Sequence, residues 1–364
     1  MQRFAFIVHP LEIGDFARKF PVAKRLPERF VEGVFRRVPA LKLSTIRGIR
    51  SATGVEAEGW FIACPLTARQ MLELPVDKVL RKIIQAGKKA EELGAPIVGL
   101  GAFTAVVGDA GITVSESLSI AVTTGNSYTV ATALEGIEYA AERMEVNLAD
   151  TRIAILGASG SIGKACARIL ARRGFELELV ARDRQKLEEL ADELESVQGA
   201  RPTVSTNISE SVRRAGVVVA VTSAIDAVVP AEDLLPGAIV CDVARPRNVA
   251  ASVAQLRDDV FVFEGGVISV PGDVDFGFNF GFPPKTSYAC MAETMILALE
   301  NRYENFSLGR DLDVDRVEEI QALAKKHGFR LAGLRSFERA VTDEYIERVR
   351  ENAKRAKRLS PALA

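Results

Sequence analysis

One segment in the middle of the chain constrains its fold more than any other. The apolar run Ile153–Leu156 leads directly into a glycine-rich turn, residues 157–163, and a helical pattern continues from Lys164 to Arg173. The turn reads Gly-Ala-Ser-Gly-Ser-Ile-Gly. A buried strand, a turn with regularly spaced glycines and a helix, in that order, are typical of the first βαβ unit of a dinucleotide-binding sheet.

The three glycines of this turn each have a mechanical reason. Gly157 permits the sharp turn off the strand, Gly160 lets the backbone approach a pyrophosphate, and Gly163 lets the helix pack close to the sheet. A pyrophosphate would then lie at the helix N-terminus, where N–H groups and the helix dipole favour negative charge. The expected cofactor contacts are Gly157, Ser159, Gly160, Ser161, Ile162 and Gly163, with Thr222 and Ser223 at the end of a later strand.

From residue 152 onward, strand patterns alternate with helical patterns. The expected strands are Ile153–Leu156, Leu177–Val180, Thr203–Thr206, Val217–Thr222, Ile239–Val243 and Val260–Phe263. This alternation predicts right-handed crossovers and a parallel sheet. We expect an α/β protein with a Rossmann-type doubly wound parallel sheet, an additional α/β substrate domain and C-terminal helices. The expected division is 1–149 for the substrate domain, 150–268 for the NADPH-binding domain, and 269–364 for an active-site loop, a cysteine-bearing helix and C-terminal helices.

The residues after the second strand of this sheet favour NADPH over NADH. Enzymes that use NAD place a carboxylate near this strand end to bind the ribose 2′-hydroxyl. Ala181 occupies that place, and Arg182 and Arg184 follow it. Guanidinium groups suit a 2′-phosphate, so we expect both arginines to contact the cofactor. A register shift of one residue would instead make Asp183 the carboxylate of an NAD site.

Composition and charge exclude several classes of protein. The net charge of −1 argues against bulk attraction to nucleic acid. No uncharged apolar stretch reaches the ~18 residues of a membrane span, and the apolar run at the N-terminus is too short for a secretory signal, so we expect a cytoplasmic protein. The four cysteines form no C-x-x-C pair and only two histidines are present, so we expect no metal site.

Cys290 is the candidate nucleophile. Pro-Pro at 283–284 forbids helix before it, and Thr286 or Ser287 could cap a helix that runs from about Ser287 to Glu300. A thiol in the first helical turn faces unpaired N–H groups, which favour the thiolate. Such a thiolate could accept an acyl group, which reduction would release as an aldehyde. The alternative is an ordinary packing role, which we assign to Cys64, Cys166 and Cys241.

Beyond these single features, the sequence as a whole resembles the long-chain acyl-[acyl-carrier-protein] reductases known from cyanobacteria. The resemblance runs from the His9 region to about Leu331. The stretches that carry it are Ser-Ala-Thr-Gly at 51–54, Leu-Gly-Ala-Phe-Thr at 100–104, Thr-Thr-Gly-Asn at 123–126, the glycine turn at 157–163, Gly-Gly-Val at 265–267, Ala-Cys-Met-Ala-Glu at 289–293, Asn-Phe-Ser-Leu-Gly-Arg at 305–310 and His-Gly-Phe at 327–329.

The resemblance implies a specific reaction. In that family the matching cysteine forms an acyl-thioester and NADPH reduces it to a fatty aldehyde, so Cys290 would take the acyl group from an acyl carrier protein or from coenzyme A. It also implies that residues near 101–104 and 124–126 line the site. From their chemistry, Thr104, Thr124 and Asn126 could donate hydrogen bonds to a thioester oxygen or could stabilise turns and cap helices. Phe103 is also expected to line the substrate site. His9 is expected there too, as an acid, a base or an orienting group, or else as a structural residue.

Two parts of the chain depart from that family. The segment Val270–Pro284, rich in Gly, Phe and Pro, differs from the cyanobacterial version, and its phenylalanines could line an apolar acyl site. Residues 332–364 extend past the family's usual end, with a basic face that suits a carrier protein, a membrane surface or simply solvent. Two other functions stay open: a shikimate-dehydrogenase-like NADP oxidoreductase without covalent catalysis, and a non-catalytic NADPH-binding sensor.

Overall fold

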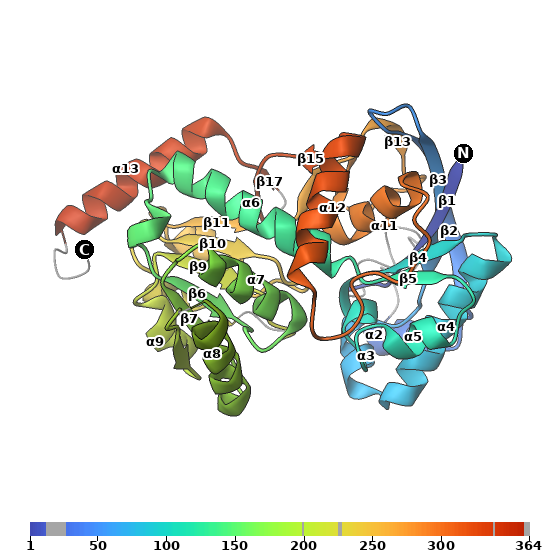
Figure 1. Cartoon of the computed structure of the whole chain (residues 1–364), viewed down its shortest axis with the longest axis horizontal. Coiled ribbons are helices and arrows are strands. Elements are labelled where there is room, and N and C mark those ends of the chain that lie inside the picture. Colours follow the sequence, from blue (N-terminus) through green and yellow to red (C-terminus); the bar gives the residue numbers. More distant parts are fainter. Residues whose placement is uncertain (12–26, 199, 225–227, 338, 360–364) are drawn as a thin grey trace. The chain divides into compact units, whose positions relative to one another are not determined.

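The fold is known from a computed structural model that describes residues 1–11, 27–198, 200–224, 228–337 and 339–359. The chain forms two compact units. Unit 1 comprises residues 1–128 and 268–332, and unit 2 comprises residues 129–267 and 333–364. The chain therefore passes from one unit to the other three times (Figure 1). Among the described residues, no helix combines the length and the apolar character that a membrane crossing requires.

Unit 2 contains a six-stranded parallel sheet. Its strands are β6 (Ile153–Leu156), β7 (Leu177–Val180), β8 (Thr203–Ser205), β9 (Val217–Ala220), β10 (Ile239–Asp242) and β11 (Phe261–Glu264). They lie in the order β11-β10-β9-β6-β7-β8, and every neighbouring pair is parallel. This is the strand order of a Rossmann sheet, in which the chain direction across the sheet reverses between β6 and β9. The expected fold class is confirmed.

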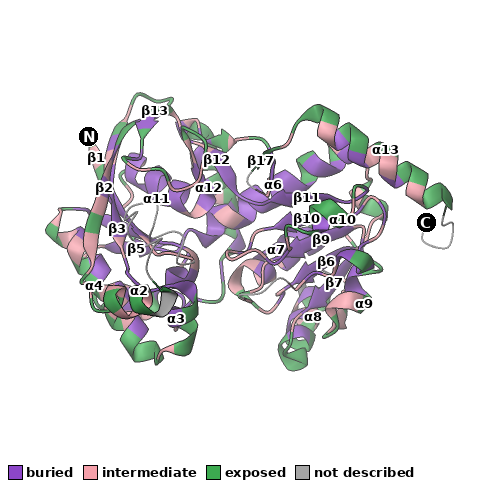
Figure 2. Cartoon of the chain, turned by 180° about the vertical axis from the view of Figure 1, so that it is seen from behind, coloured by how far each residue is buried: buried purple, intermediate pink, exposed green. Residues whose placement is uncertain are grey.

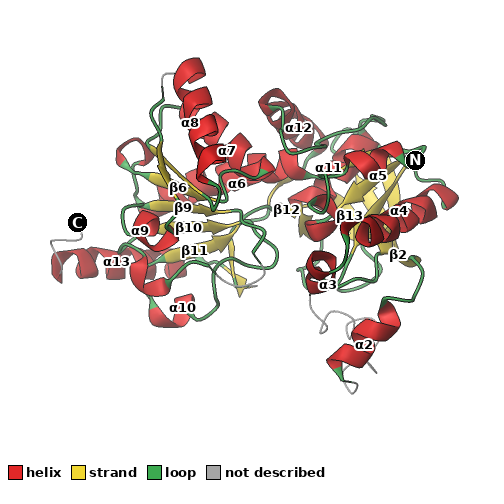
Figure 3. Cartoon of the chain, turned by 90° about the horizontal axis from the view of Figure 1, so that it is seen from below, coloured by secondary structure: helices red, strands yellow, loops and turns green. Residues whose placement is uncertain are grey.

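Helices cover both faces of this sheet (Figure 3). The helices of this unit are α6 (Asn126–Met144, which begins in unit 1), α7 (Ser161–Arg172), α8 (Arg184–Gln198), α9 (Ile208–Val212), α10 (Val253–Leu256) and α13 (Asp343–Leu359). Helices α7 and α8 lie on one face, and α9 and α10 on the other. Val212 of α9 and Val253 of α10 share one core with Ala154, Val218 and Val240 of the strands. The central strands are buried on both faces (Figure 2), which explains their uninterrupted apolar sequence.

Unit 1 contains a mixed six-stranded sheet. Its strands are β1 (Gln2–Val8), β2 (Leu41–Arg50), β3 (Glu56–Ala63), β4 (Ile97–Leu100), β5 (Ala121–Thr123) and β13 (Gly272–Asp275). They lie in the order β13-β2-β3-β1-β4-β5. Strands β3, β1, β4 and β5 are parallel, so their carboxyl ends share one edge, whereas β2 is antiparallel to both of its neighbours, β3 and β13. That shared edge carries the residues expected to bind substrate.

Helices also cover both faces of the unit 1 sheet. They are α2 (Glu28–Phe35), α3 (Ala68–Glu73), α4 (Val76–Glu92), α5 (Ile112–Glu116), α11 (Ala289–Leu299) and α12 (Val314–His327). Helix α4 forms because Val79, Ile83, Ala86 and Ala90 repeat at helical spacing, and these four residues pack on one face of the sheet. Helix α11 contacts β1 and β4 from the other face. Short strands complete the fold: β12 (Val267–Ser269), β14 (Thr286–Tyr288), β15 (Arg330–Leu331), β16 (Arg335–Ser336) and β17 (Arg339–Ala340).

The start of α11 differs from the sequence expectation. Residues Thr286–Tyr288 form β14 and pair with β12, so the helix begins at Ala289 rather than near Ser287. Tyr288 is the N-cap, in extended conformation, and no side chain caps the helix. Because residues 286–288 all stay extended in this pairing, the first helical residue is Ala289, and Tyr288 takes the N-cap position expected for Thr286 or Ser287. Cys290 still lies in the first turn.

Two further segments differ from expectation. The apolar loop expected over 270–284 contains β13, which pairs with β2 and extends the unit 1 sheet. The C-terminal part was expected to form helices, but residues 339–340 pair with 335–336 as a small hairpin, and the last helix, α13, begins only at Asp343. Strand β13 is short and mostly polar, so its own sequence gives no strand signal, and its partner β2 lies far along the chain.

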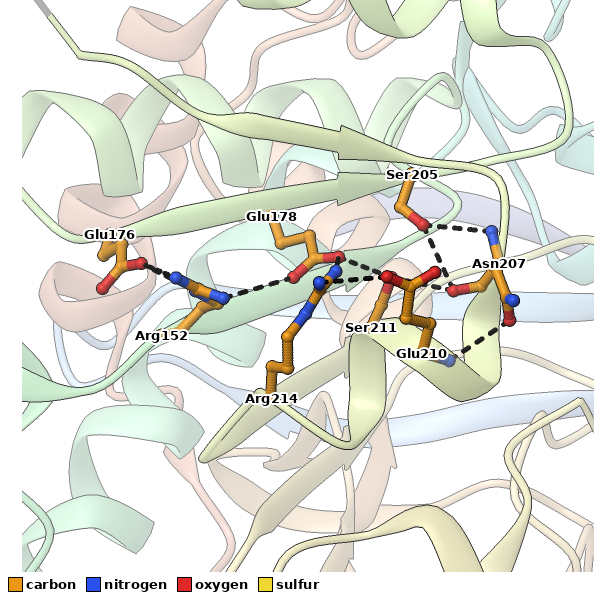
Figure 4. Close-up of polar contacts among 8 residues, drawn as sticks. All are labelled: Arg152, Glu176, Glu178, Ser205, Asn207, Glu210, Ser211 and Arg214. Atoms are coloured by element: carbon orange, nitrogen blue, oxygen red, sulfur yellow. Dashed lines mark hydrogen bonds and ion pairs between the residues drawn. The ribbon is translucent and has the colours of Figure 1, made fainter.

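A buried acidic side chain joins α9 to the unit 2 sheet (Figure 4). Glu178 of β7 is fully buried and accepts hydrogen bonds from Ser211 at 2.7 Å and from the Arg214 guanidinium at 2.8 Å. Arg152 approaches its other oxygen at 4.0 Å. Because a buried carboxylate needs charged or hydrogen-bonding partners, this cluster stabilises the helix against the strand.

We predict that Arg214→Ala lowers the free energy of unfolding by about 1–3 kcal/mol, since it leaves the buried Glu178 carboxylate with fewer partners. Urea denaturation of the variant measures this. The control is Arg201→Ala, whose side chain is 85% exposed and pairs with the exposed Glu195; it should change stability by no more than about 0.5 kcal/mol. Equal stabilities of the two variants would contradict the structural role of the cluster.

Candidate functional site

The glycine turn of unit 2 lies where the strand order reverses. Gly157 has φ +92°, and a Cβ there would lie 2.8 Å from the carbonyl oxygen of Val221, which follows β9. Gly163 lies against the turn itself, since a Cβ there would approach Ala158 Cα to 2.8 Å. Only glycine fits both contacts without displacement. The turn therefore closes tightly between β6 and β9, where Rossmann sheets bind dinucleotides.

The outer side of this turn fits a pyrophosphate. Gly160 is the N-cap of α7, and a Cβ there would meet no atom of the described residues within 4 Å except the Gly157 oxygen at 3.3 Å. No side chain caps the helix, and its first turn has no acidic residue. Backbone donors at an uncapped helix N-terminus, with open space beside Gly160, suit the negatively charged pyrophosphate of a dinucleotide. Ser159, Ser161 and Ile162 are the remaining turn residues expected to contact it.

The residues that favour NADPH lie at the carboxyl end of β7. Arg182 and Arg184 are both exposed, and Arg184 pairs with Glu188 at 2.8 Å on its own helix. Asp183 accepts a hydrogen bond from the Lys186 amide and pairs with the Lys186 ammonium at 2.9 Å. These contacts hold the pKa of Asp183 below its usual value. Asp183 thus has a local role at the start of α8, and the two guanidinium groups remain at the surface.

A hydrogen-bond network that sequence reasoning missed holds the loop after β9 in place. Asp242, at the end of β10, accepts hydrogen bonds from three backbone amides, those of residues 244, 248 and 249, at 3.2, 3.3 and 3.0 Å. Asn248 then accepts from the Thr222 amide at 2.9 Å. This network holds the loop that carries Thr222 and the exposed Ser223, both of which are expected to contact the cofactor. Its only sequence signal was an acidic residue ending an apolar strand.

Cys290 differs from the other three cysteines in exposure. Cys64, Cys166 and Cys241 are fully buried, and burial raises the pKa of Cys64 and of Cys166 to about 12. Cys290 is only partly buried and is the second residue of α11. A thiol with a pKa that high cannot serve as a nucleophile near neutral pH. Cys290 is therefore the one cysteine whose environment suits that role.

Gly125 packs directly against Cys290. It follows β5 with φ +74°, and a Cβ there would lie 2.7 Å from the Cys290 carbonyl oxygen and closer still to its Cα and Cβ. Glycine is thus required by both the backbone conformation and the space. The structure thus brings the turn at 124–126, which holds two of the expected site residues, against Cys290.

A buried carboxyl group holds this turn against α11. Glu293 lies one helical turn after Cys290 and is fully buried. It accepts hydrogen bonds from the hydroxyl of Thr123, from the hydroxyl of Ser307 at 2.8 Å and from the amide of Tyr128 at 2.8 Å. Burial raises the pKa of Glu293, and these hydrogen bonds partly offset that effect. Sequence reasoning quoted Glu293 and Ser307 as family residues but gave them no role.

His9 links two neighbouring strand ends on the same edge. Its Nε2 accepts from the Phe103 amide at 3.1 Å, so its Nδ1 carries the proton and can donate to the Pro10 oxygen at 3.0 Å. The His9 and Phe103 rings also meet edge to face at 6.2 Å. In this arrangement His9 orients the turn after β4, and its assignment to the substrate site stays a prediction.

The hydroxyl groups of the two expected threonines bond to backbone. Thr104 donates to the Gly101 oxygen at 2.8 Å, and Thr124 donates to the Ser307 oxygen. Both therefore stabilise turns in this arrangement, which is the alternative that their chemistry left open. Asn126 is the first residue of α6 and is buried. Contact of these three residues with substrate stays a prediction.

The basic C-terminal helix belongs to unit 2. Two of its cations, Arg350 and Lys354, pair with Glu145 at 2.7 and 2.8 Å. Asn352 donates to the Asp258 oxygen at 3.2 Å, and Ile346 and Val349 are buried. The helix is therefore docked on its own unit, and contact with a carrier protein or membrane stays a prediction.

Comparison with known proteins identifies one matching family model and two related proteins. The model of the shikimate / quinate 5-dehydrogenase family matches residues 138–264, the segment that holds the parallel sheet of unit 2. The aminotransferase PigE of a Serratia species is 34% identical over 345 residues, which are 92% of this chain. The chain spans only 40% of the length of PigE.

The second related protein is a reductase of the kind that the sequence was found to resemble. The long-chain acyl-[acyl-carrier-protein] reductase of Synechococcus elongatus is 27% identical over 300 residues, 77% of this chain and 84% of that protein. Among solved structures, L-tryptophan dehydrogenase from Nostoc punctiforme covers 98% of this chain and 89% of its own, with 15% identity and a TM-score of 0.40. The sequence relatives connect the chain to oxidoreductases, and the dehydrogenase match over the glycine turn supports NADPH as cofactor.

We predict that Gly125→Ala disrupts unit 1, because the new Cβ would overlap Cys290. The expected loss of unfolding free energy is about 2–4 kcal/mol, the sum of steric and backbone strain. Gly54→Ala is the matched control: Gly54 has φ +87° in the same unit, but a Cβ added there would meet no atom of the described residues within 4 Å. It should cost about 1 kcal/mol. If thermal denaturation gives equal losses, the close approach of Gly125 and Cys290 is not a constraint.

Proposed function

We propose that this chain reduces a fatty acyl thioester to an aldehyde with NADPH, through an acyl-thioester on Cys290. The observation that carries the proposal is the environment of Cys290: a partly exposed thiol in the first turn of an uncapped helix, while the other three thiols are buried. The 27% identical acyl-[acyl-carrier-protein] reductase supports the same chemistry. The parallel sheet with its glycine turn supports a nicotinamide cofactor.

The proposed reaction starts with Cys290. Its thiolate attacks the carbonyl carbon of the donor thioester, the donor carbon–sulfur bond breaks, and the donor leaves as a thiol after it takes up a proton. Two-electron reduction of the new thioester then yields the aldehyde and restores the Cys290 thiol. First-turn N–H groups of α11 favour the thiolate at the start and when it is released. Glu293 and Gly125 keep the helix start and the adjoining turn in place.

The cofactor would be held by unit 2 residues. The turn at 157–163 would bind the pyrophosphate, and Arg182 and Arg184 the 2′-phosphate. NADPH, when bound, supplies the two electrons of the reduction. Asp242 and Asn248 keep the loop with Thr222 in position through backbone hydrogen bonds.

An aromatic row in unit 1 suits the apolar part of an acyl group. Phe276, Phe280, Phe282 and Tyr288 form successive ring contacts with centroids 5.0, 5.5 and 4.3 Å apart. Phe280 and Phe282 are half-buried, so part of each ring stays accessible. Tyr288 is the N-cap of the helix that carries Cys290. A row of rings that ends at the N-cap of this helix would favour burial of an alkyl chain near its start.

The covalent step can be tested without cofactor. The protein is mixed with a long-chain acyl-coenzyme A, and its intact mass is measured. We expect an increase of one acyl group in the wild type and in Cys64→Ala, which removes a buried thiol, and no adduct in Cys290→Ala. Aldehyde formation on addition of NADPH should fall by at least about a thousandfold in Cys290→Ala, since loss of a covalent nucleophile removes the main path.

The family match over 138–264 favours a second candidate, an NADP oxidoreductase of the shikimate-dehydrogenase kind without covalent catalysis. In that case no acyl adduct forms, and Cys290→Ala keeps its turnover of a hydroxy or keto substrate. NADPH binding with no reduction of either substrate class would instead indicate a sensor. The same mass measurement and an NADPH oxidation assay separate these outcomes.

We predict that Arg182→Ala/Arg184→Ala raises the KM for NADPH about tenfold or more, with little change in the KM for NADH, because only NADPH carries the 2′-phosphate. Steady-state kinetics with both cofactors measure this. Arg201→Ala, a similarly exposed arginine of unit 2, is the control and should change neither value. The opposite result has two parts: Asp183→Ala loses the use of NADH, and Arg182→Ala/Arg184→Ala keeps the use of NADPH. That result would assign the contact with the ribose 2′-hydroxyl to Asp183.

A further inference from the structure

A basic cavity lies in unit 1, away from the cysteine-bearing helix. Its volume is about 270 Å³, and four cations line it: Arg36, Lys78, Arg81 and Lys82. Lys78, Arg81 and Lys82 share one face of α4, because they lie three and four residues apart. The cavity therefore concentrates positive charge on a protein whose net charge is −1.

Three of these cations, Arg36, Lys78 and Lys82, have no acidic partner in the described part of the chain. Arg81 pairs with Asp77 at 2.8 Å, and Lys82 donates to the Val38 oxygen at 3.0 Å. Arg36 and Lys78 are exposed and form no ion pair with any described residue. A cavity with three cations that no carboxylate compensates favours an anion, and lysine and arginine are both common phosphate ligands.

The remaining lining is not charged. Leu66 is 1% exposed and Leu74 is half-buried, so they form an apolar floor, and Gln85 adds an amide on the α4 side. A ligand that fits must therefore combine a phosphate with a compact apolar group and an amide. We propose that the cavity binds the phosphate and pantoate part of a 4′-phosphopantetheine arm, in which one methylene joins the phosphate to a dimethyl-substituted carbon, followed by a hydroxyl-bearing carbon and an amide.

The place of the cavity in the fold supports this ligand. Leu66 follows β3, and Gly125, which contacts Cys290, follows β5 on the same edge of the sheet. Strands β1 and β4 lie between them, so the two strand ends are three spacings, about 14 Å, apart. An extended pantetheine arm is longer than this distance. A thioester at its end could therefore reach the proposed nucleophile.

The path of the arm follows from the two faces of the sheet. Helix α4 packs against Ile7, Ile62 and Val98 on one face. Helix α11 packs on the other face, where a Cβ at Gly99 would overlap Thr294. The arm would have to pass over the carboxyl edge between these faces, where His9 and Phe103 lie. This inference rests on the proposed function, because it assumes an acyl thioester as substrate.

The direct test is calorimetric titration of the full chain with 4′-phosphopantetheine. This probe is preferable to coenzyme A, whose adenine nucleotide could also bind the glycine turn. We expect binding to the wild type, about tenfold or more weaker binding to Arg36→Gln/Lys78→Gln, and little binding of unphosphorylated pantetheine. The control Arg69→Gln/Lys88→Gln removes two exposed cations of the same unit outside the cavity and should bind like the wild type.

Equal affinity of the wild type and the cavity variant would overturn the proposal, and so would an equal loss in the control. The two proposals fail separately. Specific binding of 4′-phosphopantetheine without any acyl adduct on Cys290 would reject the proposed reaction and support the cavity as a binding site. An acyl adduct without specific binding would support the reaction and reject the cavity as a binding site. If both hold, kcat/KM for acyl-coenzyme A and for acyl carrier protein in the cavity variant shows which donor uses the cavity.

Discussion

The buried carboxyl group of Glu293 is the interaction on which the proposed active site depends. Its hydrogen bonds with Thr123, Tyr128 and Ser307 join the end of β5, the start of α6 and the segment after α11. A buried carboxyl group without such partners would cost several kcal/mol, so these segments are held together as one unit. Gly125 is thereby held against Cys290, the proposed nucleophile.

The same physical arrangement appears at the other proposed site. In unit 2 the close contacts of Gly157 and Gly163 close the turn, and the buried Asp242 organises the neighbouring loop through backbone amides. In both units, polar residues at the carboxyl ends of parallel strands are tied down by hydrogen bonds to the backbone. A parallel sheet places these strand ends on one edge, which is why both proposed sites lie there.

The unit 2 sheet was largely predictable because its evidence is local. Each central strand is buried on both faces and is therefore an uninterrupted apolar run, and β6 and β7 have the expected bounds. The unit 1 sheet was not, because β2 and β13 are strands with mixed polar sequence at one side of the sheet. The start of α11 was also misplaced, since the pairing of β14 with β12 joins residues that no local pattern connects.

The sequence by itself determined the glycine turn, the arginines beside it and Cys290 as the candidate nucleophile, because each depends on residue type and on its immediate neighbours. Only the tertiary structure decided which cysteine stays accessible, which glycine contacts it, and that Glu293 holds the turn in place. Those properties depend on burial and on hydrogen bonds between segments more than 150 residues apart, as for Tyr128 and Glu293. Sequence spacing carries no record of such contacts.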